Sequence, residues 1–88
     1  MIKVQLTANL QKYYPQARFE IEAATVLDLL KNMDKTATGF SGYILEDDRS
    51  VRTHVNIFVD GQLLPKKDTS RPLKPGQTVH IMQALSGG

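Results

Sequence analysis

The residues best suited to chemistry are Gly87 and Gly88, which follow a stretch that is typical of a final strand. Glycine has no Cβ, so an end of two glycines can pass through a channel too narrow for other residues. An α-carboxylate has a pKa of roughly 3.3 to 3.7 and is ionised at neutral pH. It stays a poor electrophile until one oxygen becomes a leaving group, so chemistry at Gly88 needs an activating partner. The alternative is a frayed or truncated end without function.

Other polar residues are weaker candidates. Ser86 is nucleophilic in principle, but neither His54 nor His80 has an evident acid partner that would orient it in a triad, and we expect both histidines to be strand residues. The run Glu46-Asp47-Asp48 is tempting as a metal site. However, consecutive carboxylates point in different directions and calcium-loop spacing is missing, so we expect a solvated turn.

The chain contains no cysteine. This absence excludes disulfides, thiolate zinc sites, protein-ligated iron–sulfur clusters and cysteine catalysis. With the acidic run also set aside, we predict no metal site. Any sulfur chemistry must use a group other than a side-chain thiol.

Composition predicts one small globular domain over residues 1–88, because 41% of the residues are apolar and 23% are charged. The net charge of +2 is interspersed, and Lys66-Lys67 is the only adjacent basic pair, so nucleic acid is not expected as a partner. No stretch approaches the roughly 18 apolar residues of a membrane span, and the N-terminus does not resemble a signal peptide. We expect a cytoplasmic protein without a membrane partner.

The chain begins with a predicted hairpin. Apolar residues fall on every second position over residues 2–7, which is the period of a half-buried strand. Residues 17–22 alternate in the same way after a turn signal at 14–16.

An amphipathic helix is predicted next, beginning at Thr25. The Thr25 hydroxyl can accept a hydrogen bond from the backbone N–H of Asp28, while the Asp28 carboxylate accepts one from the backbone N–H of Thr25, as in a capping box. Four apolar residues at i, i+3, i+4 and i+7 form one stripe: Val26, Leu29, Leu30 and Met33. This stripe predicts that one face of the helix packs on a sheet.

The rest of the chain predicts a short helical turn over 43–45 and further strands. Residues 55–59 alternate, and Asp60-Gly61 tolerates the positive φ angles of a tight primed turn. Residues 78–82 alternate once more. One main helix on one face of a mixed sheet of four to five strands gives the α+β class.

These elements resemble the ThiS/MoaD family of sulfur carriers, which have the ubiquitin-like β-grasp fold. The resemblance is carried by the opening MIKV, by HVNIFVDGQ and by LKPGQTVHIMQALSGG, in which a turn and a strand run into Gly-Gly. It covers the whole chain and implies a single β-grasp domain with a flexible tail at 84–88. Relatives of the small molybdopterin synthase subunit more often carry a proline pair where this chain has residues 83–86. That departure, together with HVNIFVDG, favours carriers for cysteine or other sulfur-metabolite synthesis.

The resemblance implies a reaction at Gly88. An ATP-dependent adenylyltransferase similar to ubiquitin-activating enzymes would adenylate it, and a sulfur donor, either sulfide or a sulfurtransferase, would displace AMP to leave a thiocarboxylate. A sulfur-accepting synthase would use this group in biosynthesis of the cysteine, molybdopterin or thiamin type. ATP and Mg²⁺ would belong to the activating enzyme. The chain would then bind no cofactor and would be a cosubstrate, or the small non-catalytic subunit of a synthase, rather than an enzyme.

The predicted arrangement of helix and sheet also indicates a docking surface. With the helix on one face of the sheet, Phe58, His80 and Met82 lie on the opposite, open face unless loops cover them, and with Leu85 they are our candidate partner-binding residues. Gly87 and Ser86 would thread the tail. Extended at about 3.3 to 3.6 Å per residue, the tail would reach roughly 17 Å.

Two other functions fit the same sequence. A protein modifier would pass the activated Gly88 to a lysine amine of another protein and form an isopeptide bond of the ubiquitin kind. An interaction module with an inert tail would be unchanged by deletion of both terminal glycines. The sequence does not separate carrier from modifier, because both need the same tail.

Overall fold

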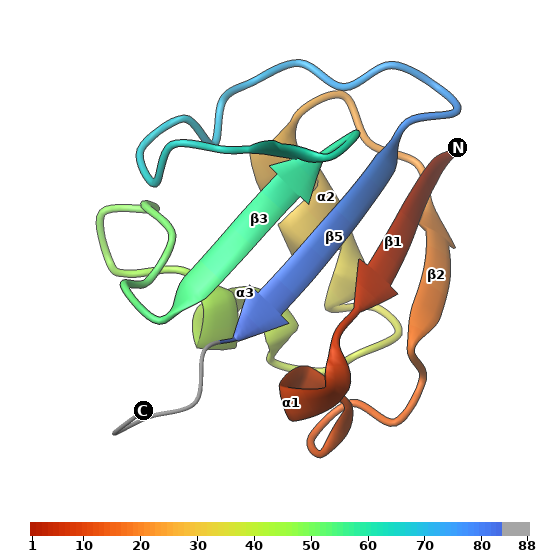
Figure 1. The fold of residues 1–88 in the computed structure, drawn as a ribbon, viewed down its shortest axis with the longest axis vertical. Coiled ribbons are helices and arrows are strands. Elements are labelled where there is room, and N and C mark those ends of the chain that lie inside the picture. Colours follow the sequence, from red (N-terminus) through yellow and green to blue (C-terminus); the bar gives the residue numbers. More distant parts are fainter. Residues whose placement is uncertain (84–88) are drawn as a thin grey trace.

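A computed structural model describes residues 1–83 of the chain (Figure 1). Within these residues the elements are β1 (Ile2–Leu6), α1 (Ala8–Gln11), β2 (Arg18–Ile21), α2 (Val26–Met33), α3 (Phe40–Ile44), β3 (Val55–Val59), β4 (Gln62–Leu63) and β5 (Thr78–Gln83). The predicted order of strands and main helix is confirmed. The short helix α1 was not predicted.

The strands form one mixed sheet in the order β2-β1-β5-β3-β4. β1 pairs antiparallel with β2 and parallel with β5, while β5 pairs antiparallel with β3. β5 therefore lies in the centre of the sheet, between the strand that opens the chain and the β3–β4 hairpin, as Figure 1 shows. Both neighbours pair with β5 over residues 79–81.

One face of the sheet is covered by α2. The predicted apolar stripe of α2 is buried throughout: Val26, Leu29, Leu30 and Met33. The sheet contributes alternate residues to the same core, among them Val4, Ile57 and Ile81. The α+β class and the packing of one main helix on one face are confirmed, and Met33 is a core residue.

The helix α2 begins at Thr25, as predicted. Thr25 Oγ1 accepts a hydrogen bond from the N–H of Asp28 at 3.1 Å. The second half of the predicted capping box is wrong, because within residues 1–83 the Asp28 carboxylate makes no hydrogen bond back to Thr25. The segment around Pro72 lies against this helix start instead, and the N–H of Val26 donates to Arg71 O at 3.1 Å.

The short helices α1 and α3 lie near the carboxyl end of β5 (Figure 1). α3 overlaps the predicted turn at 43–45 but begins at Phe40, after Gly39 with φ of 79°, and ends at Ile44, because Leu45 is extended. Asp34 caps it from outside, since Asp34 Oδ1 accepts from the N–H of Ser41 at 2.7 Å. A carboxylate is favoured at a helix N-terminus. The longest helix in the described part, α2, has eight residues, and no helix there is long and apolar enough to cross a membrane.

The hairpin of β3 and β4 has the predicted primed turn. Asp60 and Gly61 have φ of 49° and 82°, the positive values that a two-residue turn of this type requires. The turn pairs Phe58 with Leu63 across the two strands. This register decides which residues share the open face.

Candidate functional site

The predicted reactive end, Leu85, Ser86, Gly87 and Gly88, lies outside the described residues. The part of the candidate site that the structure describes is the open face of the sheet, opposite α2, together with Gln83, the last residue of β5. These two features set what a partner would meet and where the terminal segment begins.

A row of side chains crosses the open face from β2 to β4. Its members are register partners in turn: Arg18, Gln5, His80, Phe58 and Leu63. The row begins with a guanidinium at one edge and ends with a leucine that is 56% exposed. His80 Nε2 lies 3.0 Å from Gln5 Oε1. The polar and apolar halves of the face therefore meet on the central strand.

The three residues predicted on the open face, Phe58, His80 and Met82, lie there. Met82 is 40% exposed, while Phe58 and His80 are half-buried. Leu63 was missed, although a two-residue turn at Asp60-Gly61 fixes its pairing with Phe58 and so places both on one face. We call Phe58, Leu63 and Met82 the apolar patch.

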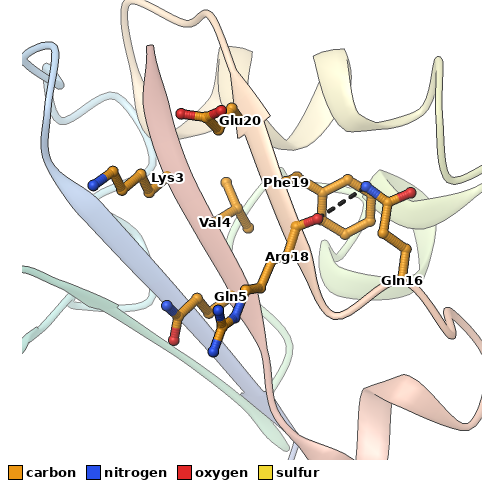
Figure 2. Close-up of a pocket in the computed structure, with 7 residues that line it drawn as sticks. All are labelled: Lys3, Val4, Gln5, Gln16, Arg18, Phe19 and Glu20. Carbon is orange, nitrogen blue, oxygen red and sulfur yellow. Dashed lines mark hydrogen bonds between the residues drawn. The ribbon is translucent and has the colours of Figure 1, made fainter.

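The polar half of the open face comprises Lys3, Gln5, Arg18 and Glu20 on β1 and β2. Lys3 pairs with Glu20, and Gln5 pairs with Arg18. Figure 2 shows these side chains around an open depression of about 550 Å³, where Gln16 Nε2 donates to Arg18 O at 2.9 Å. An open depression lined by charges of both signs suits a protein surface better than an enclosed small molecule.

The histidines form no catalytic arrangement in the described part of the chain. His80 has an amide partner rather than an acid. His54 lies in the turn before β3 and is exposed, so the prediction that it is a strand residue is wrong. The N–H of Val55 donates to Arg52 O at 3.0 Å and closes this turn, so the strand begins one residue after His54.

The acidic run at residues 46–48 is a solvated turn, as predicted. Glu46 Oε1 accepts from Arg52 Nη1 at 2.8 Å. Hydrogen bonds from the Ser50 side chain and then from its backbone N–H lower the pKa of Asp48. Across residues 1–83, no group of three His, Cys, Asp or Glu side chains could hold a metal ion.

Lys66 stabilises the loop that leads into β3. Its Nζ donates to Asn56 Oδ1 at 2.8 Å and to Val55 O. It also reaches Arg52 O at 3.3 Å and Thr53 O at 3.4 Å. Burial lowers the pKa of the Lys66 ammonium group. The hydrogen bonds of this amine hold a loop together at the edge of the open face.

The end of β5 is held by both short helices. Asn9 Nδ2 in α1 donates to Gln83 O at 2.8 Å, and Tyr43 Oη in α3 donates to Gln83 Oε1 at 2.9 Å. We call Asn9, Tyr43 and Gln83 the Gln83 clamp. Sequence reasoning missed it, because its contacts join residues 74 and 40 positions apart.

Comparison with protein families adds what the geometry alone does not show. The model of the ThiS family matches residues 4–88 of the chain. This chain belongs to the ThiS family. It is a ThiS-family sulfur carrier, and carriers of this family are non-catalytic proteins that bind no cofactor of their own. A search of curated proteins found no match.

Solved structures share the fold over the whole length of this ThiS-family chain. A chain of the Amycolatopsis orientalis BexX/CysO complex superposes with a TM-score of 0.87 at 19% identity, with 100% of both chains covered. Mycobacterium tuberculosis CysO gives 0.84 at 16% identity, covering 97% of this chain and 100% of that chain. The small archaeal modifier protein SAMP1 from Methanosarcina acetivorans gives 0.80 at 23% identity, covering 99% and 95%. The predicted ubiquitin-like β-grasp fold is confirmed.

Proposed function

We propose that this carrier bears sulfur on the α-carboxyl group of Gly88. An activating enzyme similar to ubiquitin-activating enzymes transfers AMP from ATP to the carboxylate and releases pyrophosphate. Sulfide then attacks the carbonyl carbon and AMP leaves, so a thiocarboxylate forms without net oxidation or reduction. The match to the ThiS family, which extends through Gly88, is the observation that carries this proposal.

In this proposal the chain supplies a substrate rather than a catalyst. Residues 1–83 are the body of a single domain and residues 84–88 its tail. Gly87 and Ser86 lead Gly88 into the enzyme, because glycine has no side chain to clash with a narrow channel. ATP and Mg²⁺ are bound by the activating enzyme, which also manages the charge on the phosphates.

The open face docks the activating enzyme and then the sulfur-accepting synthase. The members of the apolar patch are register neighbours, since Phe58 pairs with Leu63 and Met82 lies two residues beyond the Phe58 partner His80. Apolar anchors of this kind, with polar residues around them, are typical of protein interfaces. Leu85, two residues beyond Gln83, would extend this contact along the tail.

The position of β5 supports this role. The same strand carries His80 and Met82 on the open face and ends at Gln83. A partner that binds the face is thereby aligned with the start of the tail. The similar A. orientalis chain comes from a BexX/CysO complex, which supports docking of a body with this fold on a protein partner.

Intact-mass analysis tests the reaction. Protein incubated with its cognate activating enzyme, ATP and sulfide should gain the mass difference between one sulfur and one oxygen atom, and each component should be required. The matched control is the chain with one alanine added after Gly88, which keeps the body and a free carboxylate but displaces that carboxylate. No gain in the unextended chain, or an equal gain in the extended one, would show that the proposal is wrong.

The acceptor pathway is proposed from the residues that precede the glycines. Residues 83–86 are Gln-Ala-Leu-Ser instead of a proline pair, which favours synthesis of cysteine or another sulfur metabolite over molybdopterin. The purified thiocarboxylate should lose its sulfur to a cysteine-forming synthase from the same organism and not to a molybdopterin synthase large subunit. The opposite preference would contradict this assignment.

A second function, conjugation to proteins, is favoured by the similarity to SAMP1, which is named as a modifier. In that reaction a lysine amine attacks the Gly88 adenylate, AMP leaves and an isopeptide bond forms. An epitope-tagged chain would give ladders on blots of cell lysates, and deletion of Gly87 and Gly88 would remove them. A sulfur gain without such ladders supports the carrier alone. If the protein keeps its full function after the same deletion, it is an interaction module with an inert tail.

A further inference from the structure

The carboxyl end of β5 is held by a side chain at the point where its backbone partner turns away. β1 and β5 are parallel, so successive hydrogen bonds between them advance by two residues on each strand. The N–H of Thr7 donates to Ile81 O at 3.1 Å. The next bond of this series would join Asn9 to Gln83, but the chain has already entered α1. Asn9 Nδ2 takes the place of the missing backbone donor at 2.8 Å from Gln83 O.

The β3 side offers Gln83 no equivalent backbone bond. Carbonyl groups along a strand point alternately to its two neighbours. Thr78 O accepts from the N–H of Asp60, on the β3 side, whereas Ile81 O accepts from β1. Gln83 is two residues beyond Ile81, so its carbonyl also points away from β3, although Gln83 and Val55 are register partners. The Asn9 amide therefore anchors the last backbone carbonyl of β5.

The Gln83 side chain is also held, by a hydrogen bond from α3. Tyr43 Oη donates to Gln83 Oε1 at 2.9 Å. The Tyr43 ring packs with two other tyrosines, since its centroid lies 5.5 Å from that of Tyr13 and 6.1 Å from that of Tyr14. Tyr14 in turn packs edge-on against Phe40 at 5.0 Å. The donor that holds Gln83 is thus fixed by an aromatic cluster of the body.

From these contacts we propose that Asn9 and Tyr43 are positioning residues for the reaction at the C-terminus. The inference rests on the proposed function, in which the Gly88 carboxylate attacks the α-phosphorus of ATP bound to another protein. A five-residue segment that starts from a fixed point explores a smaller volume than one that starts from a frayed strand. The clamp therefore raises the fraction of docked complexes in which the carboxylate meets ATP.

This role differs from docking in its kinetic signature. Residues that bind the partner equally before and during the reaction affect KM, whereas residues that place the reacting group affect kcat. Neither Asn9 nor Tyr43 belongs to the apolar patch or to the polar half of the open face. We expect their loss to lower kcat for adenylation and to leave KM nearly unchanged.

The test uses two variants of the full chain, Asn9→Ala and Tyr43→Phe, in steady-state assays of pyrophosphate release by the cognate activating enzyme. Each variant should lower kcat by about 3- to 10-fold, the effect of one hydrogen bond lost from a positioning role, with KM changed by less than about twofold. Tyr43→Phe keeps the aromatic packing. It therefore tests the clamp even if Asn9→Ala lowers the melting temperature.

The chain offers a matched control for each variant. Asn32 Nδ2 donates to Glu22 O at 2.8 Å, so Asn32→Ala removes the same kind of bond from the residue directly after β2, where no tail begins. Tyr14→Phe removes a hydroxyl from the same aromatic cluster without touching Gln83. Both controls should keep the kcat of the unmodified chain. An equal fall in the controls would overturn the inference, because it would reflect general destabilisation.

Backbone ¹⁵N relaxation of Gln83 gives a second readout that needs no enzyme. Gln83 should become more mobile on the ps–ns timescale in Asn9→Ala and Tyr43→Phe but not in the controls. Unchanged kcat in both clamp variants, or unchanged relaxation of Gln83, overturns the inference alone. An unmodified chain that is not adenylated at all overturns the proposed function, and this inference with it.

Discussion

The two faces of the sheet use the same strands for different purposes, and β5 shows this most directly. Val79 and Ile81 point under α2 and are fully buried, whereas His80 and Met82, their neighbours in sequence, lie on the open face. The covered face is filled by the protein's own helix. The open face has no helix over it within residues 1–83. Adjacent residues of one strand should therefore differ sharply in what they contribute to stability and to partner binding.

The largest effect expected from this comparison is on the covered face. Ile81→Ala should lower the free energy of unfolding by about 2 to 5 kcal/mol, because it leaves a cavity in a closely packed core. Urea denaturation followed by circular dichroism would measure it. The neighbouring Met82→Ala is the control and should stay within about 0.5 kcal/mol of the unmodified chain. Similar losses in the two variants would mean that the faces are not distinct.

A smaller loss is expected at the edge of the open face, where Lys66 donates to Val55 O and Asn56 Oδ1. Lys66→Met should lower the free energy of unfolding by about 1 to 3 kcal/mol, because it leaves partly buried acceptors without a donor. The same urea titration measures it. Lys67→Met, at the exposed neighbouring residue, should have little effect. If both variants are equally stable, the Lys66 hydrogen bonds contribute nothing to folding.

The open face itself should affect binding rather than folding. Leu63→Ser combined with Met82→Ser should raise KM for the activating enzyme by about tenfold, because buried apolar anchors supply much of the binding energy of an interface. The melting temperature should hardly change. Lys31→Ser, on the exposed surface of α2, is the control. An unchanged KM in the double variant would show that this enzyme docks elsewhere.

The smallest expected effect is on the pH dependence of stability. Burial, then the charges of Tyr43 and Asp34, raise the pKa of Tyr14 from its ordinary value of 10.0. The folded state thus holds the phenol proton more tightly than the unfolded chain does. The resulting stabilisation is present below pH 10.0 and is lost as the pH rises through the folded pKa.

Tyr14→Phe cannot lose this proton. The unmodified chain should therefore lose more stability than Tyr14→Phe when urea midpoints at about pH 9 and pH 11 are compared, on either side of the ordinary tyrosine pKa. The comparison between the two chains removes the effect of other groups that titrate in this range. An identical pH dependence of the two would contradict the raised pKa of Tyr14 in the folded state.

Periodicity predicted much of the covered face, because the buried positions of a helix or strand are occupied by apolar residues at regular spacing. The stripe of α2 and the alternation of β1, β3 and β5 each repeat a pattern over five or more residues. The turn at Asp60-Gly61 was predictable for another reason, since few residue pairs accept two positive φ angles. Because this turn pairs Phe58 with Leu63, the position of Leu63 on the open face could also have been predicted.

The clamp could not be predicted in this way. α1 has only four residues, and Thr7 at its N-cap makes no side-chain capping hydrogen bond, so neither periodicity nor a cap marks it. The bond from Asn9 to Gln83 exists because a parallel pairing places the carboxyl ends of β1 and β5 side by side. Such a pairing depends on the assembled sheet. No local pattern around Asn9 distinguishes it from any other surface amide.

The central place of β5 has a consequence for biosynthesis. Of the five strands it is the last to leave the ribosome, yet it is inserted between two that were made earlier. Until it arrives, β1 and β3 have no common neighbour, and neither the docking surface nor the anchored start of the tail exists. An activating enzyme that requires both would therefore select finished molecules over nascent ones.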